Sequence, residues 1–178
     1  MRVTYPGGVL VAQRLDGWPR RYRFVFDDVV AEILTPSLAW RGGAGFDLFD
    51  SRYFVDDGQK RLELKGWDKN EPRRVEWSPQ RVEPALLAEA ERTGRARWAI
   101  TAGGQAYELR RPGLRPLRRL YAGAERVGSV RRRGKDATAD LPGLAPALQA
   151  FVLIVALKGW DPLVTKAVGL TPERQRGR

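Results

Sequence analysis

Cysteine and histidine are both missing from this sequence of 178 residues. Without cysteine the chain can form no disulfide, no thiolate metal site and no covalent intermediate on sulfur. Without histidine it lacks the commonest metal ligand and the side chain that titrates nearest neutral pH. Serine–histidine and cysteine–histidine catalysis are therefore excluded within the chain, and we expect neither an enzyme nor a bound cofactor.

Long apolar runs are also scarce. The main one, Phe151–Leu157, holds seven consecutive apolar residues within the segment Ala147–Leu157. It falls well short of the roughly 20 residues that cross a bilayer, and a run of this length is typical of a buried helix. The N-terminal residues lack the apolar core of a signal peptide. We therefore expect a cytoplasmic protein, with a peripheral position at the membrane as a variant of that expectation.

This apolar run predicts the central element of the fold. The side chains of Phe151–Leu157 cover every direction around a helix, so such a helix must be buried on all sides. Pro146 suits the first turn, while Lys158 and Gly159 suit the end. We expect a helix that begins near Pro146 and closes at Gly159, with the rest of the chain built around it.

Most of the remaining chain consists of short alternating segments, which indicate half-buried strands. In Arg21–Asp27, for example, three aromatic residues share one side. Pro84–Gly94, which proline opens and glycine ends, is the one segment that we predict as an amphipathic helix. The other predicted strands and hairpins are Val9–Gln13, Leu38–Arg41, Phe46–Asp50, Tyr53–Val55, Gln59–Lys65, Arg73–Trp77, Arg97–Arg110 and Leu117–Arg132.

Strands of this kind without strand–helix alternation predict a mainly β, antiparallel body. A closed antiparallel β-barrel of about 10–12 strands around the hydrophobic near-C-terminal helix would bury the apolar side of each strand and leave no edge exposed. We expect this barrel to occupy residues 1–162 and a basic C-terminal tail to occupy residues 163–178.

The aromatic residues fall into two groups. Aromatic side chains on an open sheet can stack on bases, but Tyr22, Phe24, Phe26, Trp98 and Tyr107 are in phase with the apolar side of their strands and are predicted to lie in the core. The tryptophans in predicted turns would instead plug the ends of the barrel or line a ligand mouth. These are Trp18, Trp67 and Trp160.

Two stretches point to a family. Phe46–Asp50 and residues 54–64 look like a strand–turn–strand unit with the turn at Asp56-Asp-Gly, and residues 125–133 lead into the apolar helix like a last hairpin. In this arrangement residues 5–160 resemble the tubby C-terminal-like superfamily, which includes the LURP-one-related and phospholipid scramblase families. The resemblance implies a closed barrel around a central helix. It implies no ligand, because neither a calcium-binding nor a phosphoinositide-binding motif can be placed on this sequence.

Charge is the strongest local feature. The chain holds 32 basic and 21 acidic residues, and the segment 110–135 has ten basic residues against one acidic residue, Glu125. Arginine forks bind phosphate bidentately, whereas arginine-rich codon usage alone would give a solvated face without a ligand. The residues that we predict to bind an anion are Arg110, Arg111, Arg115, Arg118, Arg119, Arg131, Arg132, Arg133 and Lys135.

These residues favour a non-enzymatic binding module for anionic lipid or another phosphorylated ligand. Nucleic acid is an alternative partner, because its phosphates offer the same charges. A carboxylate- and metal-dependent enzyme is the third alternative, and it would need Asp27–Asp28, Asp47–Asp50 or Asp56–Asp57. Asp56-Asp-Gly is better explained as a turn, so we predict no metal site. The sequence leaves the oligomeric state open.

Overall fold

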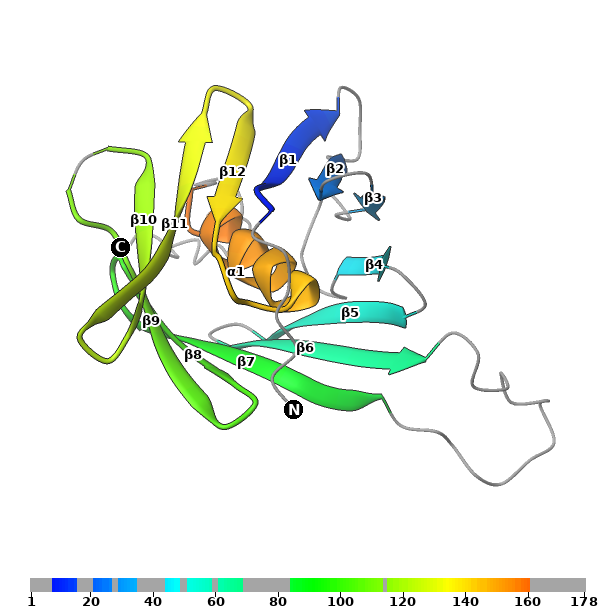
Figure 1. Ribbon diagram of the computed structural model, residues 1–178, viewed down its shortest axis with the longest axis horizontal. Coiled ribbons are helices and arrows are strands. Elements are labelled where there is room, and N and C mark those ends of the chain that lie inside the picture. Colours follow the sequence, from blue (N-terminus) through cyan, green and yellow to red (C-terminus); the bar gives the residue numbers. More distant parts are fainter. Residues whose placement is uncertain are drawn as a thin grey trace, which may run out of the picture.

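The computed structural model of the chain describes residues 8–15, 21–26, 29–34, 44–48, 51–58, 61–68, 84–113 and 115–160. They form antiparallel strands and one helix (Figure 1). The elements in chain order are β1 (Leu10–Leu15), β2 (Arg21–Phe26), β3 (Val29–Leu34), β4 (Ala44–Leu48), β5 (Ser51–Gly58), β6 (Arg61–Asp68), β7 (Ala85–Gly94), β8 (Arg97–Ala102), β9 (Gln105–Arg110), β10 (Leu117–Ala122), β11 (Glu125–Arg133), β12 (Asp136–Asp140) and α1 (Pro146–Lys158).

Each strand pairs antiparallel with its neighbours in sequence, and β1 also pairs with β12 through Leu10–Ala139 and Ala12–Ala137. The strand order in the sheet is β1-β12-β11-β10-β9-β8-β7-β6-β5-β4-β3-β2. The ladders differ in extent. The β5–β6 ladder runs the full length of both strands, whereas β3 and β4 share a single residue pair, Leu34–Gly45. The mainly β, antiparallel prediction is confirmed, and the β3–β4 seam is where the wall is thinnest.

The helix α1 is buried as predicted. Its residues from Phe151 to Ala156 are each at most 1 % exposed, and Figure 1 shows α1 in the middle of the curved sheet. Its backbone comes nearest to β12 and β1. Inward residues of the strands complete one core with it, including Leu62, Leu64 and Ile100. A helix with no solvent face has therefore found apolar partners on every side.

Both ends of α1 follow from the residues named in the sequence analysis. Pro146 stands in the first turn, where its missing N–H costs nothing. At the other end Gly159 is in a right-handed conformation, with φ −76°, so the helix closes without the left-handed residue that glycine often supplies. The Gly159 N–H donates to the Val155 carbonyl at 3.3 Å, and the Trp160 N–H donates to the Leu157 carbonyl at 3.0 Å. The last turn therefore satisfies its own carbonyls.

The predicted helix at Pro84–Gly94 is wrong, because Ala85–Gly94 forms strand β7. Alanine, leucine and glutamate favour helices, but pairing with β6 on one side and β8 on the other overrides that weak preference. Ala88 and Ala90 are buried while Glu89 and Glu91 point outward. This alternation has the period of a strand, and the sequence analysis gave it less weight than the flanking proline and glycine.

Other differences are local. The sequence analysis did not predict β3 or β12, and it placed 66–68 in a loop although these residues extend β6. The predicted strands Leu38–Arg41 and Arg73–Trp77, the aspartates Asp27, Asp28 and Asp50, and the predicted tail 163–178 lie outside the described residues. The inward positions of Tyr22, Phe24, Phe26 and Trp98 are confirmed, and Tyr107 is half-buried against the same core.

Candidate anion-binding end of the sheet

Three connections lie together at one end of the sheet. They are the β7–β8 turn at 95–96, the β9–β10 connection at 111–116 and the β11–β12 turn at 134–135. The Arg111 N–H donates to the Ala96 carbonyl at 3.2 Å, and the Arg132 N–H donates to the Pro116 carbonyl at 2.9 Å. We call these connections, with the strand ends that lead into them, the basic end. All the residues predicted to bind an anion belong to it.

A row of arginines crosses the outer side of the basic end. Arg110 pairs with Arg97 on β8 and with Arg119 on β10. The Nη2 of Arg110 donates to Glu108 at 2.7 Å, and its guanidinium carbon lies 4.9 Å from the centre of the Tyr121 ring. The hydrogen bond from Arg110 lowers the pKa of Glu108. This carboxylate offsets part of the charge of the row.

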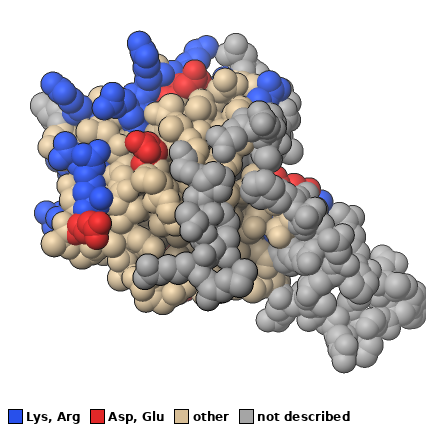
Figure 2. Space-filling model, viewed as in Figure 1, with Lys and Arg blue, Asp and Glu red and all other residues tan. Residues whose placement is uncertain are grey.

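Five of the predicted residues are exposed at the basic end. Figure 2 shows Lys and Arg side chains gathered along the edge of the molecule where Figure 1 places the β11–β12 turn and the β9–β10 connection. The exposed members are Arg111, Arg115, Arg131, Arg133 and Lys135. Positive charges that are separated in sequence therefore form one patch that a flat anionic surface could meet.

Arg118 does not belong to that patch. It is 2 % exposed, because β10 turns it to the same side as the buried Leu120. In the described part of the chain its Nε and Nη1 atoms have no hydrogen-bond partner. Burial is the main cause that lowers the pKa of Arg118 to about 10, and the nearby charges of Arg111 and Arg92 contribute to the same shift. Arg118 therefore does not share the exposed face of the other predicted anion-binding arginines.

The Arg118 guanidinium lies at the end of α1. A Cβ added to Gly159 would collide with Arg118 Nη2, so the guanidinium fills the space beside that glycine. The Trp160 ring covers it, with 5.5 Å between the guanidinium carbon and the ring centre. Arg132 is also turned inward, and its Nη1 donates to the Trp160 carbonyl at 3.3 Å. Trp160 thus lies at the end of α1, against Arg118 and Arg132.

The sequence analysis missed other basic residues of this end. Arg92 pairs with the buried Trp98, which places Arg92 on the inner side of β7. Its Nε and Nη2 donate to the carbonyls of Gly94 and Arg95 at 3.2 and 3.3 Å. Arg92 was overlooked because the predicted helix at 84–94 would have separated it from the hairpins of β9–β12, and Arg95 and Arg97 were overlooked because they lie outside the charge-rich segment 110–135. The alternation of β7 was the signal that could have placed them.

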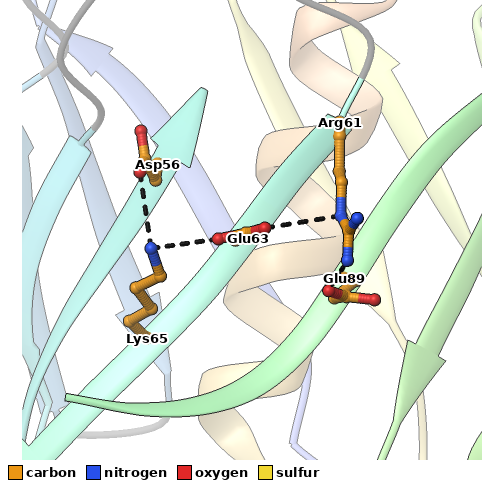
Figure 3. A network of polar contacts seen from close by, with 5 residues as sticks. All are labelled: Asp56, Arg61, Glu63, Lys65 and Glu89. Carbon is orange, nitrogen blue, oxygen red and sulfur yellow. Dashed lines mark hydrogen bonds and ion pairs between the residues drawn. The ribbon is translucent and has the colours of Figure 1, made fainter. Parts of the chain in front are cut away.

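Besides Glu108 at the basic end, a second group of carboxylates lies on β4–β7 and is paired with cations. Glu63 contacts Lys65 at 3.0 Å and Arg61 at 3.4 Å, and Arg61 also pairs with Glu89 (Figure 3). Asp56 joins the network through Lys65 at 3.4 Å. Asp47 accepts from Arg52 at 2.8 Å. Within the described ranges no three carboxylates converge as metal ligands would.

Neither a membrane-spanning helix nor a known relative provides information about this site. No helix in the described ranges has the length and apolar content that a membrane crossing requires. A comparison of the chain with protein-family models, curated proteins and solved structures found no match. The chemistry of the basic end is therefore the observation from which a function can be inferred.

Proposed function

We propose that this chain is a binding module, without catalytic activity of its own, that engages the phosphate-bearing surface of an anionic membrane through the basic end. The observation that carries the proposal is the gathering of Arg111, Arg115, Arg131, Arg133 and Lys135 on one exposed edge. They come from two connections that are remote from the carboxylate network of β5–β7. The basic side chains outnumber the carboxylates Glu108 and Asp136 at this end, and an excess of positive charge attracts an anionic surface.

The electrostatic attraction between the basic end and an anionic bilayer is large enough for reversible binding. Each basic residue close to an anionic bilayer contributes roughly 1 kcal/mol, and the attraction decays within a Debye length. Several such residues on one edge can therefore hold the protein at a bilayer without an inserted segment. Binding of this kind weakens steeply as salt rises.

Nucleic acid is supported less well. Binding to single strands uses aromatic side chains that stack on bases. Phe24, Phe26 and Trp98 are buried in the core, so they are not available for stacking. Binding to duplex phosphates alone would use the same arginines and remains an outcome of the test.

The proposal includes a continuous barrel wall, a position at the cytoplasmic face of a membrane and membership of the tubby C-terminal-like superfamily. A continuous wall would make the basic end rigid, because each connection would be anchored by paired strands on both sides. The ladder from β7 to β12 supports this. The single pair between β3 and β4 lies elsewhere in the strand order, away from the basic end.

Co-sedimentation with vesicles tests the proposal, and β11 offers a matched pair of variants. Arg131 and Arg126 are both exposed on β11, but Arg131 lies in the basic end and Arg126 lies beside the opposite turn. We expect the protein to bind phosphatidylserine-containing vesicles at low salt and to ignore phosphatidylcholine vesicles. Arg131→Gln should weaken binding about fivefold, the loss of roughly 1 kcal/mol, and Arg126→Gln should leave it unchanged.

Equal binding to neutral and anionic vesicles would refute the membrane proposal. Equal losses of vesicle binding in Arg131→Gln and Arg126→Gln would also refute it, because binding would then depend on the net charge of the protein and not on the basic end. A duplex DNA that binds as tightly as the anionic vesicles, with the same loss in Arg131→Gln, would transfer the function to nucleic acid.

A further inference from the structure

Arg118 is a buried cation that pairs with no carboxylate among the described residues. Its Nε and Nη1 atoms also lack acceptors in the part of the chain that the structure describes. Burial of an unpaired charge is strongly unfavourable, and such a group in a native structure calls for an explanation.

Capping of the helix does not supply that explanation. The carbonyls of Val155 and Leu157 already accept hydrogen bonds from Gly159 and Trp160. Arg118 lies beside this turn without a hydrogen bond from Nε or Nη1 to it. Its charge is favourable at the negative end of the helix dipole, but that effect is small compared with the cost of burial.

The atoms that surround Arg118 are also donors. The indole Nε1 of Trp160 is buried and has no acceptor within the described ranges. Arg132 is turned to the same side and its Nη1 reaches the Trp160 carbonyl. Arg92 and Arg111 are close enough for their charges to act on Arg118. The missing partner is therefore rich in acceptor oxygens and carries negative charge.

We infer that Arg118, Trp160 and Arg132 form a site for a single phosphate group at the C-terminal end of α1. The inference deepens the proposed function, and it rests on the premise that the partner carries phosphate. The guanidinium fork matches two phosphate oxygens, and the Trp160 Nε1–H can donate to a third. A phosphate suits this site better than a carboxylate because its additional oxygen can accept from the Trp160 Nε1–H while two oxygens accept from the guanidinium of Arg118. The phosphate belongs either to a lipid headgroup or to a small soluble ester.

The site can be tested by thermal unfolding of the full chain with inorganic phosphate, glycerol phosphate, or chloride at matched ionic strength. We expect both phosphates to raise the Tm saturably, by about 5–10 °C when the ligand is near 100 times its Kd, and chloride to do less. Arg118→Met should keep or raise the Tm without ligand and should lose the phosphate response. Arg126→Met, which removes an exposed charge at the opposite end of β11, should respond like the wild type.

Arg118→Lys keeps the charge and loses the fork, so it provides a second test if Arg118→Met fails to fold. We expect it to bind phosphate at least tenfold more weakly. A wild-type chain that responds no better to phosphate than to chloride overturns the site, and so does an Arg118→Met or Arg118→Lys variant with the full response. Tighter binding of glycerol phosphate than of inorganic phosphate supports the site and assigns it to an ester. Equal binding supports the site and shows that it recognises the phosphate group without contacting the rest of the ester.

The two proposals fail separately. If the protein binds phosphate at Arg118 but does not bind anionic vesicles, the phosphate site is supported and the membrane proposal is refuted. If vesicle binding depends on Arg131, but neither phosphate nor glycerol phosphate raises the Tm above its value in chloride, the membrane proposal is supported and the phosphate site is refuted.

Discussion

Arg118 lies under the ring of Trp160, with 5.5 Å from its guanidinium carbon to the ring centre. The two residues come from different parts of the fold. Arg118 lies on β10 and Trp160 follows α1, and they are in contact at the basic end. A cation on an aromatic ring gains some attraction when it is removed from water. That attraction is weaker than an ion pair. Among the described residues the guanidinium of Arg118 therefore still lacks an anionic partner.

The first prediction concerns the pH dependence of Arg118→Met. An unpaired buried cation destabilises the fold, so the variant should be equal to the wild type or more stable by about 1–4 kcal/mol near neutral pH. The pKa of Arg118 is about 10 in the folded protein and ordinary in the unfolded chain. Above this pKa the unfolded chain binds more protons than the folded protein, so wild-type stability rises with pH relative to the variant.

The advantage of Arg118→Met should therefore be constant below about pH 9 and shrink as the pH passes 10. Urea unfolding of both proteins across this range measures the difference. An advantage that grows with pH would contradict the origin of the pKa shift in burial, and a variant that is much less stable at every pH would make Arg118 a structural residue.

The second prediction concerns the core. Leu153 is fully buried in α1, so Leu153→Ala leaves a cavity and should lower the free energy of unfolding by about 2–5 kcal/mol. Leu86 is 52 % exposed on β7, and Leu86→Ala should cost less than about 1 kcal/mol because most of its surface is already in water. Denaturant unfolding compares them. Equal losses would mean that α1 is not enclosed as the structure shows.

The third prediction concerns a close approach between strands. A Cβ on Gly128 would collide with the Asp140 carbonyl oxygen, while a Cβ on Gly113 would meet no atom within 4 Å. Gly128→Ala should therefore destabilise the protein by about 1–3 kcal/mol, as overpacking does. Gly113→Ala should change the Tm little. A Gly128→Ala variant as stable as the wild type would show that β11 and β12 can separate at that point.

The fourth prediction concerns the network around Glu63. Glu63→Gln removes the carboxylate shared by Arg61 and Lys65 but leaves each cation another partner, Glu89 and Asp56 (Figure 3). The side chains are partly exposed and each cation keeps a partner, so the loss should be below about 1 kcal/mol and should diminish with salt. Thermal unfolding at low and high salt measures it. A large, salt-independent loss would show that the network is more than a surface feature.

Much of the fold could be predicted from the sequence because its strongest signals are simple. Apolar residues all around Phe151–Leu157 required burial, and Pro146 marked where the helix starts. Alternation located most described strands. The segment 84–94 was predicted wrongly because proline, glycine and helix-forming residues are local signals, whereas the pairing of β7 with β6 and β8 is made by distant parts of the chain.

The site was predicted in position but not in detail. Counting charges located the basic end, yet it treated all arginines of the segment alike. In Leu117–Ala122 the period of a strand places Arg118 on the side of Leu120, and in Glu125–Arg133 it places Arg132 on the side of Val130. That alternation could have separated inward from outward arginines. The contact of Arg118 with Trp160 could not be predicted, because it depends on where the end of α1 meets β10.

The most direct test of a phosphate site at Arg118 follows the arginine Nε–Hε signals by NMR during titration with inorganic phosphate. The account predicts that the Arg118 signal shifts saturably and disappears in Arg118→Lys, while the Arg126 signal stays in place. If Arg118 remains unchanged while the signals of exposed arginines such as Arg131 move, phosphate binds only the outer patch and the inferred site does not exist.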